Sequence, residues 1–361
     1  MKIFAIALLT LSLMLASPLS VPAEEKLQII TMNFPAFDFA RQVAGERAEV
    51  TLLLPPGVDA HSFEPSPRDV IAMQEADLLI YNGGIGENWI SGMLKSMGTD
   101  APAAIAMMDQ VDTVQEELVE GMEDVPHAHS HGDEDDHDDH DDHEHEEHGD
   151  HDDHDHDEHE EHGDHDDHDH DEHEEHGDHD HDHEERELDE HVWTTPNNAI
   201  KISRAILAKL SELDPAGRDS YQANFDRFEQ ELKALDQDFR ALFAAAKRNT
   251  IVLGDRFPMR YFTNEYKLDY YAAFPGCAAE TEPSARTIAF LMDTIRKEEI
   301  PVVFHIEFSN QKAANAIAAE TGAKTLLLHS AHNVSSQEMA DGITYLSIMR
   351  QNLNTLKEAL Y

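Results

Sequence analysis

Residues 132–187 consist almost entirely of His, Asp, Glu and Gly, and a segment of that composition cannot build a folded core. Apart from Arg186 no other residue type occurs there, and the unit HGDHDDHDHDEHEE appears twice without change from His148 onward. Ordering a backbone costs roughly 1–2 kcal/mol per residue, and no apolar side chain is present to offset that cost. We therefore predict a mobile, disordered loop over residues 126–188 that interrupts the folded part of the chain.

The chemistry of this segment points to metal ions. Of the 26 His residues in the chain, 21 lie between His127 and His183, among carboxylates. Imidazole is the commonest metal ligand, and neighbouring carboxylates attract divalent cations. The alternative is a solvated polyanion that only keeps the protein soluble, but Asp and Glu alone would serve that purpose. We therefore expect the His127 to His183 tract to provide weak zinc sites.

The large negative charge is mostly local to this tract. The formal net charge is −49, and residues 133–190 hold 35 of the 75 acidic residues but only one of the 26 basic ones. The rest of the chain is acidic as well, with no cluster of Lys and Arg that could meet phosphate groups. Binding to nucleic acid or to anionic lipid is therefore not expected.

The first residues read as an export signal. Lys2 precedes an apolar run over residues 3–16, and small residues favour cleavage after Ala23, so residues 1–23 are predicted to be a signal peptide. The run is shorter than the about 20 residues that a membrane-spanning helix needs. We expect an exported, periplasmic monomer, and the absence of Cys near the cleavage position argues against a lipid anchor.

The single Cys277 excludes an internal disulfide and any metal site built on Cys pairs. We expect this side chain to be buried, although a soft extra metal ligand is the alternative reading. A metal site in this chain must therefore use His, Asp and Glu.

The rest of the chain alternates between strand and helix patterns. This alternation predicts an α/β fold: two β/α lobes with parallel-rich sheets, residues 24–215 and 248–361, joined by a long rigid helix over residues 216–247. In the first lobe, Ser66, Pro67 and Asp69 have the spacing of a helix start. Expected strands are 27–34, 48–55, 77–83, 250–254, 268–274, 301–308 and 324–330; expected helices are 36–46, 66–76, 88–98, 199–213, 284–299, 311–322 and 336–360.

Four residues stand where a predicted strand or the acidic tract gives way to a loop: His61, His191, His329 and Asp255. Ligands of α/β proteins bind where strand ends face a crevice. These four side chains are therefore our first candidates for metal ligands in a cleft between the lobes. A lone His is more often a structural residue, so position alone does not assign the site.

Three stretches then carry a family resemblance. The stretches are PPGVDAHSFEPSPRDV around His61, HVWTTPNNA from His191, and YLSIMRQNLNTLKEAL over residues 345–360. Together with the acidic His-rich segment before His191, they resemble the zinc- and manganese-binding proteins of ABC transporters, of the high-affinity zinc-uptake type. The resemblance implies that His61 and His191 are metal ligands. Thr194 and Thr195 stand where relatives often carry Leu and an acid.

The last part of the chain departs from that family pattern. Relatives have His-x-Ala-Phe-x-Tyr after a strand where this chain has GDRFPMRYF, and many end the last strand with Asp where this chain has His329. The resemblance then implies three His and one carboxylate, with Asp255 as the carboxylate in a register that can shift by one residue. His332 is an alternative to His329. Further candidates are His305, Glu307 and Glu280, with orientation of a ligand, a buried polar pair or loop capping as their simpler roles.

Three imidazoles and one oxygen in a tetrahedral set favour Zn²⁺, whereas Mn²⁺ prefers more carboxylates. The sequence thus predicts a protein, not an enzyme, that captures zinc and delivers it to the permease and ATPase of an ABC transporter, with the His-rich loop as collector or sensor. Alternatives are a manganese-binding transporter component and a metal-buffering or adhesion protein. A zinc hydrolase is disfavoured because no H-E-x-x-H motif is present.

Overall fold

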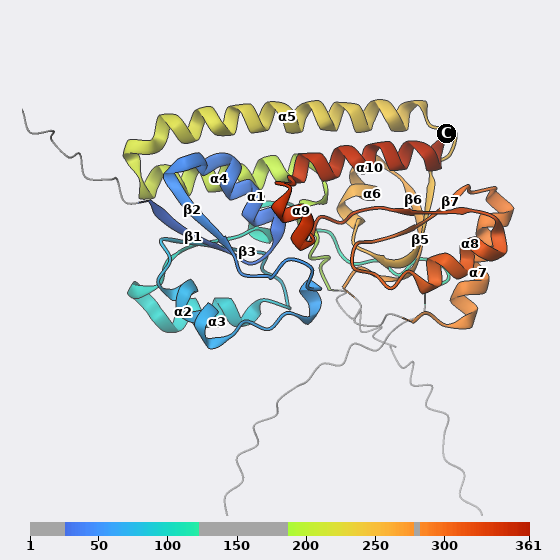
Figure 1. Cartoon of the computed structure of the whole chain (residues 1–361), viewed down its shortest axis with the longest axis horizontal. Coiled ribbons are helices and arrows are strands. Elements are labelled where there is room, and N and C mark those ends of the chain that lie inside the picture. The colour runs from blue at the N-terminus through green and yellow to red at the C-terminus, as the bar shows by residue number, and fades with distance from the viewer. Residues whose placement is uncertain (1–25, 123–186, 278–281) are drawn as a thin grey trace, which may run out of the picture. The chain divides into compact units, whose positions relative to one another are not determined.

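The computed structural model describes residues 26–122, 187–277 and 282–361 (Figure 1). The predicted signal peptide, nearly all of the predicted loop and Glu280 lie outside these residues. Among the helices in the described ranges, none has both the length and the apolar character that crossing a bilayer requires.

The first sheet has four parallel strands in the order β2-β1-β3-β4. β1 runs beside β2 from Leu27 opposite Ala48 to Thr31 opposite Leu52. β3 reads LLIY and is buried along its whole length, as a central strand covered on both faces must be. The strand bounds are β1 Leu27–Thr31, β2 Ala48–Leu52, β3 Leu78–Tyr81 and β4 Ala103–Ala106.

The sequence did not reveal β4. Its four residues, AAIA, include one large apolar side chain, Ile105, so the strand has almost no hydrophobic signal of its own. Parallel pairing with β3 forms this strand. Tertiary context therefore outweighs local propensity here.

Side-chain caps set the start of the helices beside this sheet. The side chain of Asn33 accepts a hydrogen bond from Ala36 N at the start of α1. The predicted capping box at Ser66 is confirmed, because Asp69 accepts from Ser66 N while the Ser66 side chain accepts from Asp69 N. The helices of this part are α1 Phe34–Ala44, α2 Pro67–Gln74, α3 Asn88–Met97 and α4 Pro196–Leu213.

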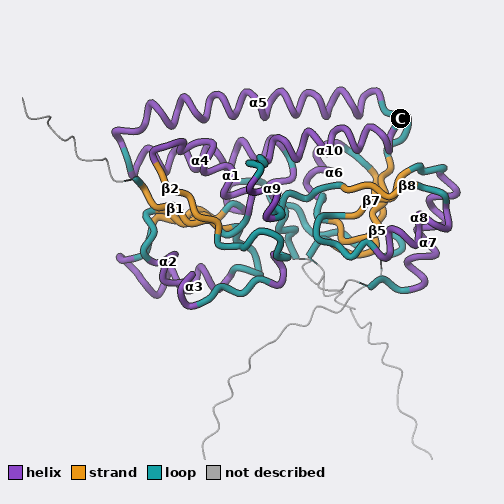
Figure 2. Tube along the Cα trace, in the orientation of Figure 1, coloured by secondary structure: helices purple, strands orange, loops and turns teal. Residues whose placement is uncertain are grey.

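The second sheet repeats the parallel arrangement, in the order β6-β5-β7-β8 (Figure 2). The register between β5 and β6 shifts between Leu253 and Arg256, which marks an irregularity just before the end of β5. The elements are β5 Thr250–Phe257, α6 Arg260–Tyr266, β6 Asp269–Pro275, α7 Ala285–Glu298, β7 Val302–His305, α8 Lys312–Thr321 and β8 Lys324–Leu327.

The long helix α5 (Arg218–Ala245) packs against α1 and α4 and also against α10 (Tyr345–Leu360), as Figure 1 shows. In the first half of α5, the ring of Phe228 lies 5.9 Å from that of Phe39 in α1. Nearer the other end, the ring of Phe239 lies 5.0 Å from that of Phe262 in α6. One continuous hydrophobic core therefore connects both sheets through this helix. The predicted fold class, two α/β lobes with a long helix, is confirmed; the predicted lobe boundaries remain a prediction.

The last predicted helix, residues 336–360, is wrong as a single element. The chain forms a short helix, α9 (Ser336–Ala340), and then α10. Gly342 between them has φ 73°, a left-handed conformation that ends a helix. Thr344 then starts α10 anew, because its side chain accepts a hydrogen bond from Ser347 N.

Candidate metal-binding site

His191 is held by a carboxylate two residues before it. Asp189 Oδ1 accepts a hydrogen bond from His191 N at 2.8 Å and lies 3.2 Å from His191 Nδ1, and both side chains are 1% exposed. Burial opposes the charged form of His191, but the carboxylates of Asp189 and Glu190 outweigh burial and raise the pKa of the imidazole. Because Nδ1 faces Asp189, a metal ion would have to bind through Nε2, in the arrangement common among metal-binding His residues.

Trp193 links this segment to a loop from the other end of the chain. Its Nε1 donates to the carbonyl of Ser330 at 2.8 Å, and its own carbonyl accepts from the hydroxyl of Tyr345 at 2.7 Å. Trp193 is fully buried. Contacts with residues after β8 therefore fix the position of the segment that starts at His191.

That loop brings His332 beside His191. The two rings lie 5.4 Å apart between centroids at an interplanar angle of 87°, and Trp193 lies 4.7 Å from the ring of His332. Both imidazoles line one pocket, which we name the histidine pocket. Its lining residues come from both lobes: Val58, Asp59, Ala60, His191, Arg256, Pro258, Gly276, Ile306, Glu307, Phe308, Ser330, His332 and Asn333.

Gly276 shows how closely the wall of this pocket is packed. A Cβ atom at this position would lie 2.7 Å from the carbonyl oxygen of Phe257 and 3.3 Å from Cε1 of His191. The first of these distances is too short for any side chain without a shift of the backbone. Close packing beside the imidazole of His191 thus requires a glycine at the start of the stretch GCAAETEPS.

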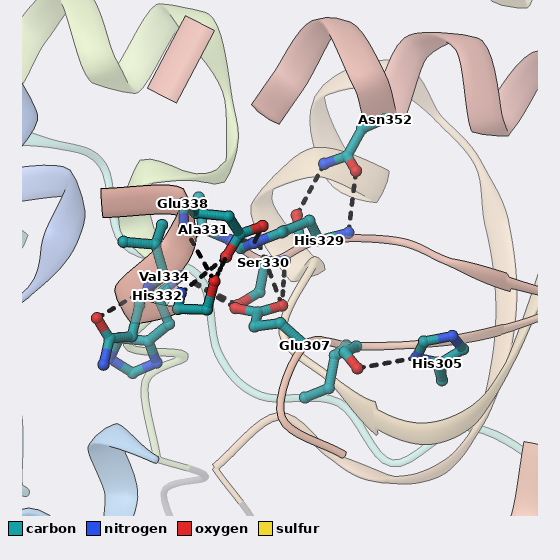
Figure 3. Close-up of polar contacts among 12 residues, drawn as sticks. His305, Glu307, His329, Ser330, Ala331, His332, Val334, Glu338 and Asn352 are labelled. Atoms are coloured by element: carbon teal, nitrogen blue, oxygen red, sulfur yellow. Dashed lines mark hydrogen bonds and ion pairs between the residues drawn. The ribbon is translucent and has the colours of Figure 1, made fainter. Parts of the chain in front are cut away.

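Glu307 holds the loop that carries His332 (Figure 3). Its side chain is 8% exposed and accepts hydrogen bonds from Ser330 N at 2.8 Å, from the Ser330 hydroxyl and from His332 N at 3.3 Å. Glu307 also lines the histidine pocket. Its contacts fit the predicted role of orienting a ligand, here through the backbone of His332.

His329 lies near the loop but not among the lining residues of the pocket. Its Nδ1 accepts from Ala331 N at 3.0 Å, and its backbone N–H and carbonyl both bond the side-chain amide of Asn352 in α10. Its Nε2 is buried without a hydrogen-bond partner, 4.0 Å from Glu338. The structure therefore separates His329 from His332, the two alternatives from the sequence.

Asp255 also lies outside the lining of the pocket. Its carboxylate accepts from the backbone N–H of Arg256 at 2.9 Å and of Ile306 at 3.4 Å. The next residue, Arg256, lines the pocket instead and forms an ion pair with Asp59 at 2.5 Å. The sequence did not predict Arg256 and Asp59 as residues of the site. The uncertain register near Asp255 allowed its neighbour Arg256 to occupy this place.

His61 belongs to the 3-10 turn Ala60–Ser62, next to two residues of the pocket lining, Asp59 and Ala60. His305 Nδ1 lies 3.0 Å from the carbonyl of Ile306, and Figure 3 shows its ring on the side of Glu307 away from His332. Glu280 and the His127 to His183 tract lie outside the described residues.

Cys277 is half-buried, and its N–H donates to Glu116 at 2.8 Å. Burial raises the pKa of its thiol well above the ordinary value. Across the described ranges, no group of three or more His, Cys, Asp or Glu side chains is gathered closely enough to hold a metal ion as the side chains stand. The described part of the site thus contributes a pair of imidazoles, His191 and His332.

Comparisons with known proteins show the family to which the chain belongs. A family model described as "Zinc-uptake complex component A periplasmic" matches residues 29–359. The chain is 28% identical over 336 residues to the high-affinity zinc uptake system protein ZnuA of Bacillus subtilis, covering 93% of this chain and 88% of that protein. It is also 28% identical to the zinc-binding lipoprotein AdcA of Streptococcus pneumoniae, but spans only 56% of the length of that protein.

Solved structures share the fold. The Zn(II)-bound ZnuA-like domain of Streptococcus pneumoniae AdcA has a TM-score of 0.65 and 24% identity, with 93% of this chain and 99% of that chain covered. The metal-dependent lipoprotein YcdH of Bacillus subtilis has a TM-score of 0.66 at the same identity and the same coverage. With the family model matched over nearly the whole described chain, this protein belongs to the ZnuA family, component A of zinc-uptake complexes.

Proposed function

We propose that this protein binds one Zn²⁺ ion tightly in the histidine pocket and delivers it to the permease of an ABC transporter. The observation that carries the proposal is the contact between His191 and His332, whose rings meet edge to face in one pocket although they come from distant parts of the chain. Imidazole is a preferred ligand of Zn²⁺. The named relatives in Bacillus subtilis and Streptococcus pneumoniae are zinc-uptake and zinc-binding proteins.

His61 is the third ligand in this proposal. The turn that carries it follows Asp59 and Ala60, which both line the histidine pocket. Three neutral imidazoles suit tetrahedral Zn²⁺ better than Mn²⁺, which prefers more carboxylates. We assign supporting roles to His329 and Asp255, because neither residue lines the histidine pocket itself. Asp255 accepts from the backbone N–H groups of Arg256 and Ile306, and His329 Nδ1 accepts from Ala331 N and lies 3.4 Å from Glu307.

Among the described residues, two carboxylates near the imidazoles are occupied by hydrogen bonds that orient other groups. Asp189 accepts a hydrogen bond from the backbone N–H of His191 and lies against its Nδ1. Glu307 accepts from backbone N–H groups and a hydroxyl of the loop that carries His332. Such carboxylates orient ligands, whereas a general base must reach the reacting water. Capture and release of the ion therefore account for the site better than catalysis.

Export to the periplasm and a role of the His-rich segment complete the proposal. The predicted signal peptide would place the protein beside a membrane permease, and the 21 His residues between His127 and His183 would raise the local zinc concentration by tethering weak sites near a tight one. The domain limits 24–215, 216–247 and 248–361 belong to the same proposal.

The test uses the full-length protein with His191→Ala, His332→Ala and, as a matched control, His305→Ala. A chelator that strips the weak sites should leave one zinc ion per protein in the wild type and in His305→Ala, and none in the other two variants. When each variant replaces the wild-type gene, growth on limiting zinc should persist with His305→Ala and fail with His191→Ala and His332→Ala. Retention of the chelator-resistant ion by both His191→Ala and His332→Ala would refute the proposal.

A further inference from the structure

A second pocket adjoins the histidine pocket on the side of the first sheet, and we name it the vestibule. It lies at the carboxyl ends of the strands: Asn33 follows β1, Leu54 follows β2 and Asn82 follows β3. His332 and Ala60 line both pockets. The two spaces therefore share a wall that includes one of the proposed zinc ligands.

The charges of the two pockets differ. The vestibule is lined by two carboxylates, Glu87 and Glu190, and by no Lys or Arg among its described lining residues. The histidine pocket instead includes the guanidinium of Arg256. Burial raises the pKa of Glu87 to about 7, because removal from water opposes its negative charge. A cation in the vestibule would stabilise that charge.

Both carboxylates are held in place by one glycine-rich loop. Glu87 Oε2 accepts from Asn82 N at 2.6 Å and from Gly83 N at 3.0 Å, and Glu190 Oε1 accepts from Gly86 N at 3.2 Å. Gly84 has φ +83°, and a Cβ there would collide with the carboxylate of Glu190. Both carboxylates therefore accept backbone hydrogen bonds from this loop and at the same time line the vestibule.

Two buried amides supply an observation independent of the carboxylates. Asn82 is 5% exposed; its Nδ2 donates to the carbonyl of Glu190 at 2.8 Å, while its Oδ1 is buried with no hydrogen-bond partner. Asn33 is 2% exposed; its Oδ1 caps α1, while its Nδ2 is buried with no partner. A buried polar atom without a partner is costly, so a pocket lined by two such residues is suited to a polar occupant.

We propose that the vestibule binds a second divalent cation through Glu87, Glu190 and the Oδ1 of Asn82, and that this cation passes to the histidine pocket by way of His332. The Nδ2 of Asn33 then donates to a water molecule on the ion. Oxygen ligands hold Zn²⁺ less tightly than imidazoles and also accept Mn²⁺. The vestibule is thus an entry site, and this role rests on the proposed function of the histidine pocket.

The two Trp residues of the chain allow each pocket to be observed separately. Trp89 lines the vestibule and is 38% exposed, whereas Trp193 is buried against His191 and His332. Fluorescence of the Trp89→Phe variant reports the histidine pocket through Trp193. The part of the wild-type signal that this variant loses reports the vestibule.

The experiment titrates Zn²⁺ into the full-length wild type, Trp89→Phe, Glu87→Gln and the charge-matched control Glu75→Gln. Glu75 is exposed and follows directly after α2. We expect the Trp89 signal to saturate at a higher zinc concentration than the Trp193 signal. Glu87→Gln should weaken the Trp89 transition about tenfold or more and slow the loading of the Trp193 site in stopped-flow mixing, while its final Trp193 signal stays unchanged. Glu75→Gln should behave as the wild type.

A second measurement, on the wild type, distinguishes a lost cation site from a loop that Glu87→Gln has damaged. Crystals of the wild type soaked with Mn²⁺ should show anomalous scattering between Glu87 and Glu190. Absence of that peak, or equal Trp89 transitions in Glu87→Gln and Glu75→Gln, would overturn the vestibule. A missing Trp193 transition in Trp89→Phe would instead overturn the histidine pocket, so the two failures are distinguishable.

Discussion

The imidazole rings of His191 and His332 meet at 87° with their centroids 5.4 Å apart, one from the segment before α4 and the other from the loop after β8. Trp193 fixes this relationship, since it contacts both rings and bonds the carbonyl of Ser330. Two distant segments thus share one pocket.

The two His residues of the loop after β8 should have different effects on zinc. We expect His332→Ala to lower the affinity of the tight site by at least about a hundredfold, since a ligand is lost, and His329→Gln to change it by less than about threefold. Competition with a chromogenic chelator measures both. If His329→Gln lost as much affinity as His332→Ala, the distinction that the structure draws between them would be wrong.

The carboxylate behind His191 should tune the site. Asp189 bonds both the backbone N–H and Nδ1 of His191. We expect Asp189→Asn to reduce zinc affinity by roughly 10- to 100-fold, the usual effect of losing a carboxylate that orients a metal-bound imidazole. The same substitution should lower the pKa of His191, because the charge of Asp189 raises it. NMR titration of the His191 ring in the zinc-free protein checks the second effect; an unchanged pKa would contradict it.

Arg256 places a positive charge in a pocket meant for a cation, balanced by its ion pair with Asp59. We expect Arg256→Gln to raise zinc affinity by roughly tenfold, and Asp59→Asn to lower it by a similar factor, since about 1.4 kcal/mol of electrostatic free energy corresponds to tenfold. The double variant should lie near the wild type. Calorimetric competition measures all three, and a loss of affinity in Arg256→Gln would show that the guanidinium supports the site.

Asp38 should make the folding free energy depend on pH. This side chain of α1 is 1% exposed and accepts from Tyr345 N at 2.9 Å. Burial raises its pKa from 3.8 to about 6. Its contribution to the free energy of unfolding is therefore fully present below about pH 4 and is lost as the pH rises through about 6, with a total near 3 kcal/mol.

The measurement for Asp38 compares urea unfolding of the wild type with that of Asp38→Asn, which keeps an acceptor for Tyr345 N but no charge. Between pH 4 and pH 7 the wild type should lose stability relative to the variant. Parallel curves over this range would mean that the Asp38 carboxyl titrates normally in the folded protein.

Removal of the His-rich segment tests its accessory role. We expect deletion of residues 128–185 to lower the number of bound zinc ions while one chelator-resistant ion remains, because the ligands of the histidine pocket lie outside the deleted residues. Isothermal titration of the deletion variant measures both numbers. A variant without any tight site would show that the segment belongs to that site.

The sequence predicted most of the fold because local and tertiary preferences agree. Strands such as LLIY are apolar along their whole length, and the Ser66–Asp69 capping box has a fixed spacing. The helix break at Gly342 was missed, since one glycine within a helical pattern does not say by itself which conformation it adopts. β4 was missed because its pairing with β3, and not its composition, forms the strand.

The site was less accessible to sequence reasoning than the fold. The H-x-W-x-x-P stretch identified His191 through a local motif, but the choice between His329 and His332 depends on which way a loop turns after β8. Hydrogen bonds from Ser330 N and His332 N to Glu307 set that turn, and Ala331 within it has φ 63°. Alternation along a strand gives no information once the strand has ended.

The anchoring of α5 at both ends has a mechanical consequence. Phe228 packs against Phe39 on one side and Phe239 against Phe262 on the other, so a wide swing of the halves would tear aromatic rings from their neighbours. The loop near residue 330 is tied to the segment before residue 60, since Asn333 Nδ2 donates to the carbonyls of Pro55 and Val58. Under the proposed function, release of the ion would require the permease to break these local contacts while α5 holds the two sheets together.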